Sequence, residues 1–145
     1  MKDLEAITEL LGGAQTIQCE PTSEMDFISL VRKGLPVQSA VSAAKSLTLG
    51  EHKTFAWLRS SKARAARSGS RENRLRAGES ERLLRLVRVA AAATNVLGSR
   101  DKAVRWLQKS NRELGGEVPV DLLDTDVGFQ AVMDVLQRVE HGVIG

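Results

Sequence analysis

Apolar residues recur at helical spacing along almost the whole of this 145-residue chain. The longest such series starts around residues 78–80, and its apolar face comprises Leu83, Leu84, Val87, Ala90, Ala91, Thr94 and Leu97. Residues three or four apart share one side of an α-helix, whereas a half-buried strand alternates residue by residue. Alternation is almost absent, and aromatic residues make up only 3% of the chain. A core built from Leu, Val and Ala suits packed helices, so we predict an all-α fold.

Turn and capping residues divide the chain into about eight expected helices. Glycine ends several of them, at Gly12, Gly34, Gly98 and Gly142. Thr48, with Glu51 three residues later, has the pattern of a capping box and predicts a helix start. Ser99 and either Thr125 or Asp126 are expected to cap the last two helices. Residues 14–22 are expected to form a loop, and "VPVDLLDT" a single short turn that begins at Pro119.

Charge is unevenly distributed, although the net charge is only +3. Residues 59–76 contain seven basic residues and one acid, whereas residues 111–145 contain seven acids and two basic residues. Such separation predicts two different surfaces, of which the basic one is the better candidate for a polyanion. The alternative is an ordinary solvated basic loop.

Three short helices are expected within residues 36–69, the second apolar and the third basic. This order is typical of a helix-turn-helix, in which the third helix enters the major groove and flanking cations contact phosphates. The candidate DNA-binding residues are Ser61, Lys62, Arg64, Arg67, Arg71 and Arg74. The alternative is a three-helix bundle with a solvated basic face.

Few residues of the chain could carry out catalysis. His52 and His141 are the two histidines, Cys19 is the single cysteine, and neither a metal-spaced cluster nor a phosphate-cradling glycine loop is present. We therefore expect no enzyme activity, no cofactor and no metal. A lone cysteine cannot form an internal disulfide, which fits a reducing, cytoplasmic location. No apolar run approaches the roughly 20 residues of a membrane span, so no membrane partner is expected.

From about residue 75 to the end, the chain resembles the toxin-binding domain of Xre/MbcA/ParS antitoxins. The matching residues are "GESERLLRLVRV", Ala103 with "WL" at 106–107, Asn111, "LGG" at 114–116, Pro119, "LL" at 122–123, Thr125, Gly128, Val132, Leu136 and "RVEHGV". The resemblance implies an antitoxin of a type II toxin–antitoxin system. Such a protein would neutralise a RES-domain, NAD-consuming toxin by bringing its C-terminal segment to the toxin's active site, and would repress its own operon.

The resemblance also implies an order of domains and a set of contacts. We expect an N-terminal helix and loop (1–23), an Xre-like helix-turn-helix domain (24–76) and a small helical toxin-binding domain (77–145). The "SSKARAARSGS" stretch departs from the family, whose relatives commonly have a threonine beside an apolar residue there. A homodimer within a toxin–antitoxin hetero-oligomer is expected, bound to operator DNA. Candidate toxin-binding residues are Trp106, Asn111, Leu123, Arg138, Glu140, His141, Val143, Ile144 and Gly145.

One alternative function stays open. The chain could be a stand-alone helix-turn-helix repressor whose C-terminal domain serves only for dimerisation. The connector "SNRELGGEVP" fits either role, because Gly115 and Gly116 permit positive φ and allow a tight reversal. Asn111 can bond its own backbone or cap a turn.

Overall fold

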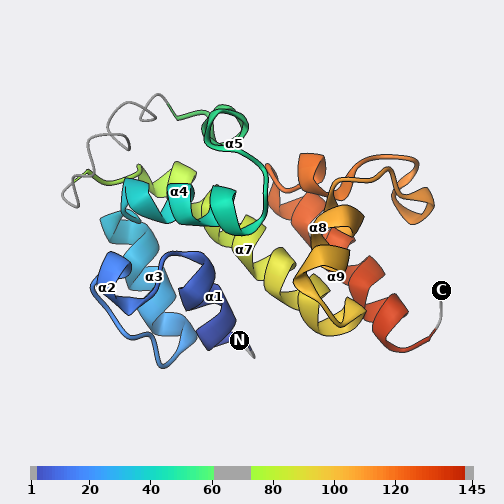
Figure 1. The fold of residues 1–145 in the computed structure, drawn as a ribbon, viewed down its shortest axis with the longest axis horizontal. Helices are drawn as coiled ribbons and strands as arrows, with labels where there is room; N and C mark the ends of the chain where they lie inside the picture. Colours follow the sequence, from blue (N-terminus) through green and yellow to red (C-terminus); the bar gives the residue numbers. More distant parts are fainter. Residues whose placement is uncertain (1–2, 61–72, 143–145) are drawn as a thin grey trace. The chain divides into compact units, whose positions relative to one another are not determined.

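All regular elements are helical in the part of the chain that the computed structural model describes, residues 3–60 and 73–142. One isolated antiparallel bridge, between Pro36 and Arg74, is the exception among these residues. The all-α prediction is therefore confirmed (Figure 1). The chain divides into two compact units, residues 1–87 and 88–145, within the long helix α7 (Ala77–Leu97). The expected division between residues 76 and 77 falls at the start of this helix.

Small side chains on one central helix hold the first unit together. The unit contains α1 (Leu4–Leu10), α2 (Ala14–Ile17), α3 (Glu24–Lys33), α4 (Val37–Ser46), α5 (Glu51–Leu58) and the first part of α7. Helix α4 contacts α1, α2 and α5 (Figure 1). Its buried face is made of Val37, Ala40, Ala43 and Ala44, so neighbouring helices can approach closely. Phe27, Phe55 and Leu58 are the larger buried side chains of this unit's core.

Two segments far apart in sequence are joined where α3 meets α4. The Leu75 N–H donates to the Leu35 carbonyl (2.7 Å), and the Val37 N–H donates to the Asn73 carbonyl (3.0 Å). The buried Leu35 N–H donates to the Ser80 hydroxyl oxygen at 2.8 Å. These bonds satisfy backbone groups that burial would otherwise leave unpaired. They fix the chain just before α7 against the start of α4.

Two local predictions in this unit are wrong. Residues 14–17, expected to be loop, form α2 because Ile17 is buried and the Thr16 hydroxyl donates to the Gly12 carbonyl at 2.9 Å. Thr48 is not the cap of α5, whose N-cap is Gly50 at φ 80°. Thr48 has φ 52° and its N–H donates to the Lys45 carbonyl, so it closes α4 instead.

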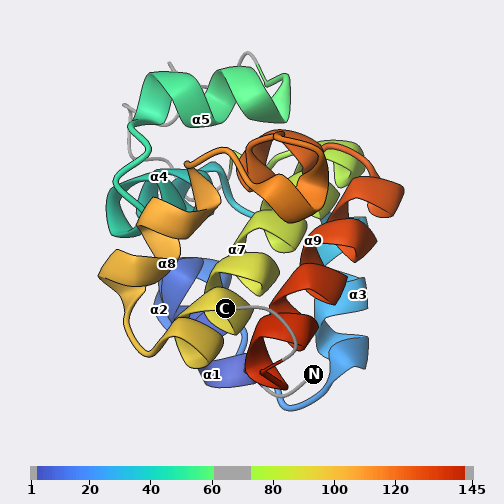
Figure 2. The ribbon, with the colours of Figure 1, turned by 90° about the vertical axis from the view of Figure 1, so that its right-hand side faces the viewer.

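The second unit contains the last part of α7, α8 (Arg100–Leu107), the 3₁₀ turns η1 (Arg112–Leu114) and η2 (Pro119–Leu122), and α9 (Asp126–Glu140). Figure 2 shows α8 and α9 on either side of the C-terminal part of α7. The Arg88 guanidinium on α7 lies over the Phe129 ring of α9, 4.7 Å from its centroid, a cation–π contact between these two helices. Turn η1 contacts α9, and η2 contacts both α8 and α9.

Candidate functional site

An N-terminal cap and one buried side position helix α8. Gly98, at φ 91°, follows α7, and the Ser99 hydroxyl then accepts from the Lys102 N–H at 3.2 Å, as predicted. Ala103 and Leu107 are buried, whereas Trp106 is half-buried. Trp106 therefore contributes to the packing of the unit and also keeps part of its indole accessible, as a contact residue requires.

The connector after α8 is closed by Asn111. Its N–H donates to the Glu117 carbonyl (2.9 Å), and its carbonyl accepts from the Gly116 N–H (2.9 Å). Its side-chain oxygen accepts from the Glu113 N–H at 2.9 Å. Gly115 and Gly116 have φ of 67° and 86°, as predicted for the tight reversal. All these hydrogen bonds are to residues of the same loop, so Asn111 stabilises the loop conformation.

The second half of the connector packs against the start of α9. Pro119 opens η2, as predicted, and both Pro119 and Leu123 are buried. A β-carbon on Gly128 would overlap the Leu122 carbonyl oxygen, so only glycine allows this close approach. Thr125 caps α9 by accepting from the Gly128 N–H at 3.0 Å. Pro119, Thr125 and Gly128, which belong to the family resemblance, thus position the start of α9.

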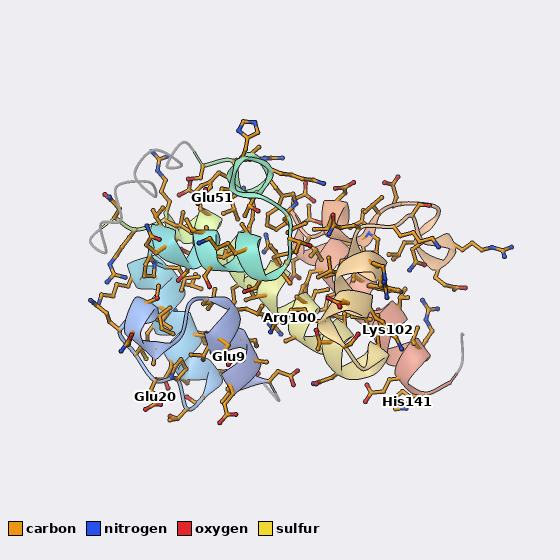
Figure 3. The ribbon with its side chains drawn as sticks, viewed as in Figure 1. Glu9, Glu20, Glu51, Arg100, Lys102 and His141 are labelled. Carbon is orange, nitrogen blue, oxygen red and sulfur yellow. The ribbon has the colours of Figure 1, made fainter. Side chains whose placement is uncertain are left out.

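The outer end of α9 carries a shallow hollow of about 390 Å³, lined by Asp134, Gln137, Arg138 and His141. These residues are three or four positions apart and therefore share one side of the helix. All four side chains are exposed, and they offer both hydrogen-bond donors and acceptors. Figure 3 marks His141 at the end of α9. Such a surface can hold a polar segment of a partner by hydrogen bonds.

The structure brings together only some of the predicted contact residues. Arg138 and His141 line the hollow, and Glu140 is exposed on the last turn of α9. Trp106 and Asn111 belong to α8 and the connector, which lies beside the opposite, N-terminal end of α9 (Figure 2). Val143, Ile144 and Gly145 lie outside the described residues.

Leu123 requires a correction. It has no exposed surface, because η2 folds it into the core of the second unit. The neighbouring Leu122 is half-buried, so of the two leucines it is the one closer to solvent.

Asp134 and Gln137 also line the hollow, but they are not among the contact residues predicted from the sequence. Both precede Arg138 and His141 by about one helical turn, and extending the spacing of those two residues backwards along the final helix would have found them.

The predicted DNA-binding residues fall mostly outside the described part of the chain. This applies to Ser61, Lys62, Arg64, Arg67 and Arg71. Arg74 is described, and its guanidinium donates to the Gly34 carbonyl at 2.8 Å. Arg74 therefore helps to hold the junction of α3 and α4. Helices α4 and α5 coincide in sequence with the first two of the three short helices predicted within residues 36–69.

The described residues contain no group of three or more His, Cys, Asp or Glu side chains that could hold a metal ion. Within the same residues, no helix is both long and apolar enough to cross a membrane. Cys19 is a half-buried free thiol.

The C-terminal part of the chain is similar to known antitoxin domains. The family model described as the antitoxin Xre/MbcA/ParS C-terminal toxin-binding domain matches residues 92–142. A protein named antitoxin Xre from Photorhabdus laumondii is 38% identical over 80 residues, 54% of this chain and 54% of that protein. Proteins of the same name are 38% identical over 78 residues in Yersinia enterocolitica (53% of each chain) and 35% identical over 72 residues in Pseudomonas putida (50% of this chain and 45% of that one). The chain spans about half the length of the curated relatives it matches.

Proposed function

Because its C-terminal part belongs to the Xre/MbcA/ParS family of antitoxin toxin-binding domains, we propose that this chain is the antitoxin of a type II toxin–antitoxin pair. The match of residues 92–142 to the toxin-binding domain is the observation that carries the proposal. In this role the protein acts by binding a partner toxin and is not itself an enzyme.

The toxin-binding surface in this proposal is the outer end of α9. Arg138 and His141 lie in one hollow with Asp134 and Gln137, and the chain continues from there into Val143, Ile144 and Gly145. The polar hollow supplies hydrogen bonds, and the apolar tail supplies contact area at the toxin's active-site entrance. The partner that the resemblance implies is a RES-domain toxin that consumes NAD.

Co-expression with the toxin encoded next to this gene tests the proposal. We expect the intact chain to protect cells and to co-purify with the toxin. A chain that ends at Gly142 keeps α9 complete, and it should bind the toxin more weakly and leave NAD consumption less inhibited. The double variant Arg138→Ala, His141→Ala should lower affinity about tenfold or more, since the few residues that dominate an interface each cost over about 1 kcal/mol when truncated.

Glu81→Ala is a control, because Glu81 is exposed on α7 in the first unit and should leave toxin binding unchanged. Full neutralisation by the chain that ends at Gly142 would refute the role of the tail. If no neighbouring protein binds, the chain is better described by the alternative, a stand-alone repressor.

Operator binding by the first unit completes the proposal, with autorepression as its result. It is supported by the order of α4 and α5 before the basic stretch of residues 59–76. Arg64→Ala with Arg67→Ala should remove binding to the chain's own promoter fragment in gel shifts at fixed salt, and should leave toxin binding intact. Unchanged gel shifts would show that another part of the chain contacts DNA.

A further inference from the structure

Charge is also unevenly distributed within the second unit. Lys102 and Arg105 are exposed three residues apart on one side of α8, and the exposed Lys109 follows just beyond the end of this helix. These three cations are called the basic stripe. Figure 3 marks Lys102 at the first turn of this helix.

An acidic surface lies on the connector and the first turn of α9. Glu117, Asp121 and Asp126 are exposed there. Neither these three carboxylates nor the three cations of the basic stripe form an ion pair with another described residue. Both charged surfaces are therefore available to a partner.

Each charged surface also has an apolar residue beside it. Trp106 is half-buried next to the basic stripe, and Val127, next to Asp126, is 81% exposed. Stable contacts between proteins combine an apolar centre with a charged rim, because exposed ion pairs alone contribute little. The two surfaces are thus complementary in both respects: cations with an indole on one, carboxylates with a valine on the other.

We propose that the basic stripe of one copy of this chain docks on the acidic surface of a second copy. Trp106 packs against Val127 of the second molecule, and the cations of α8 face its Glu117 and Asp121. A second copy is the partner whose complementary chemistry is present on this domain. The contact joins two different surfaces, so it is either made twice across a twofold axis or repeated head to tail. It does not depend on the proposed antitoxin function and can be measured without toxin or DNA.

A charge exchange between two variants tests this contact. The basic-reversed variant carries Lys102→Glu and Arg105→Glu, and the acid-reversed variant carries Glu117→Lys and Asp121→Lys. Asp126 is left unchanged because an acid in the first turn of α9 stabilises that helix. Sedimentation velocity of the full-length chain at low and high salt should show self-association that weakens as salt rises.

Each variant alone should self-associate about tenfold more weakly or worse, because attraction becomes repulsion at two positions. An equimolar mixture should regain association, since the reversed surfaces match each other. Arg100→Glu is the matched control, because Arg100 is exposed at the start of α8 and lies off the stripe. It should self-associate like the unchanged chain, and circular dichroism confirms the fold of each variant.

Two results would overturn the proposal. The first is self-association of both reversed variants at the original strength, which would place the contact elsewhere. The second is a mixture that fails to regain association although both variants are folded. Loss of duplex DNA binding by the basic-reversed variant, with self-association unchanged, would assign the stripe to nucleic acid instead.

Discussion

Gly34 in the first unit and Gly128 in the second both lie too close to a neighbouring backbone segment to carry a side chain. In each, an added β-carbon would overlap a backbone carbonyl oxygen, that of Leu75 beside Gly34 and that of Leu122 beside Gly128. The two differ in where the neighbouring carbonyl comes from. Leu75 is far along the chain from Gly34, whereas Leu122 belongs to the connector that leads directly into the helix of Gly128.

This difference describes how the two units are built. The first unit is closed by contacts between distant segments, including the bonds of Leu35 to Leu75 and to Ser80. The second is shaped by a sequence of local devices: the Ser99 cap, the Asn111 loop and the Thr125 cap. Local devices leave a fixed spacing in the sequence, and distant contacts do not.

Replacement of Gly34 by alanine is expected to have the largest effect on stability. Gly34 has φ 97°, which strains any residue with a β-carbon, and the new methyl would also push the Leu75 carbonyl away. We expect a loss of about 4 kcal/mol, as strain and overpacking add. Hydrogen exchange followed by mass spectrometry should show faster exchange in the first unit alone.

Gly50→Ala provides the control for this strain. Gly50 has φ 80° but nothing within 4 Å of an added β-carbon. Gly50→Ala should lower the free energy of unfolding by about 1 kcal/mol, because only the backbone strain applies there. Equal losses in the two variants would mean that the contact with Leu75 contributes nothing.

Replacement of Gly128 by alanine tests the local counterpart. The helical backbone of α9 favours alanine by about 1 kcal/mol, but the methyl group must displace the Leu122 carbonyl. We expect a net loss of about 2 kcal/mol, confined to the second unit. Gly78→Ala, in the first turn of α7, has open space around it and should instead gain up to about 1 kcal/mol. Stabilisation by both alanines would refute the packing role of Gly128.

Much of the second unit could be predicted from the sequence. The caps at Ser99 and Thr125, the reversal at Gly115 and Gly116 and the start of η2 at Pro119 are all confirmed. Each is a property of a few adjacent residues with a known backbone preference. The burial of Leu123 was not predictable in this way, since the choice between it and Leu122 depends on how η2 packs.

The first unit was less predictable, for the same reason. The helices α3, α4 and α5 follow their apolar spacing, but α2 forms because Ile17 reaches the core, and Arg74 is held by the Gly34 carbonyl. From the sequence, Arg74 was one more cation in a basic stretch. Only a contact between distant segments distinguishes a structural arginine from one available to DNA.

Ser80→Ala sharpens the comparison by removing a single distant bond. The variant leaves the buried Leu35 N–H without an acceptor, so we expect a loss of about 2 kcal/mol in denaturant unfolding of the first unit. Ser39 is the matched control, because it is also fully buried but its hydroxyl has no hydrogen-bond partner. Ser39→Ala should be neutral or slightly stabilising. A similar loss in both variants would show that the hydroxyl volume matters and not the bond to Leu35.

The smallest expected effect concerns a local device within the first unit. The hydrogen bond from the Thr22 backbone N–H (2.8 Å) lowers the pKa of Asp26 below the ordinary aspartate value of 3.8. Burial opposes this effect, and the hydrogen bond from the Thr22 hydroxyl (3.2 Å) lowers the pKa by a smaller amount. A carboxyl group with a lowered folded-state pKa stabilises the fold above its unfolded-state value, and this stabilisation is lost as pH falls through the folded-state pKa. Asp26→Asn should therefore unfold at a slightly lower denaturant concentration than the unchanged chain at neutral pH. The difference should disappear in acid. Asp26 is half-buried and its hydrogen bonds to Thr22 are exposed to solvent, so the difference should be well below that of Ser80→Ala. A difference that persists unchanged into strong acid would mean that the charge of Asp26 is not its source, and that this turn depends on shape alone.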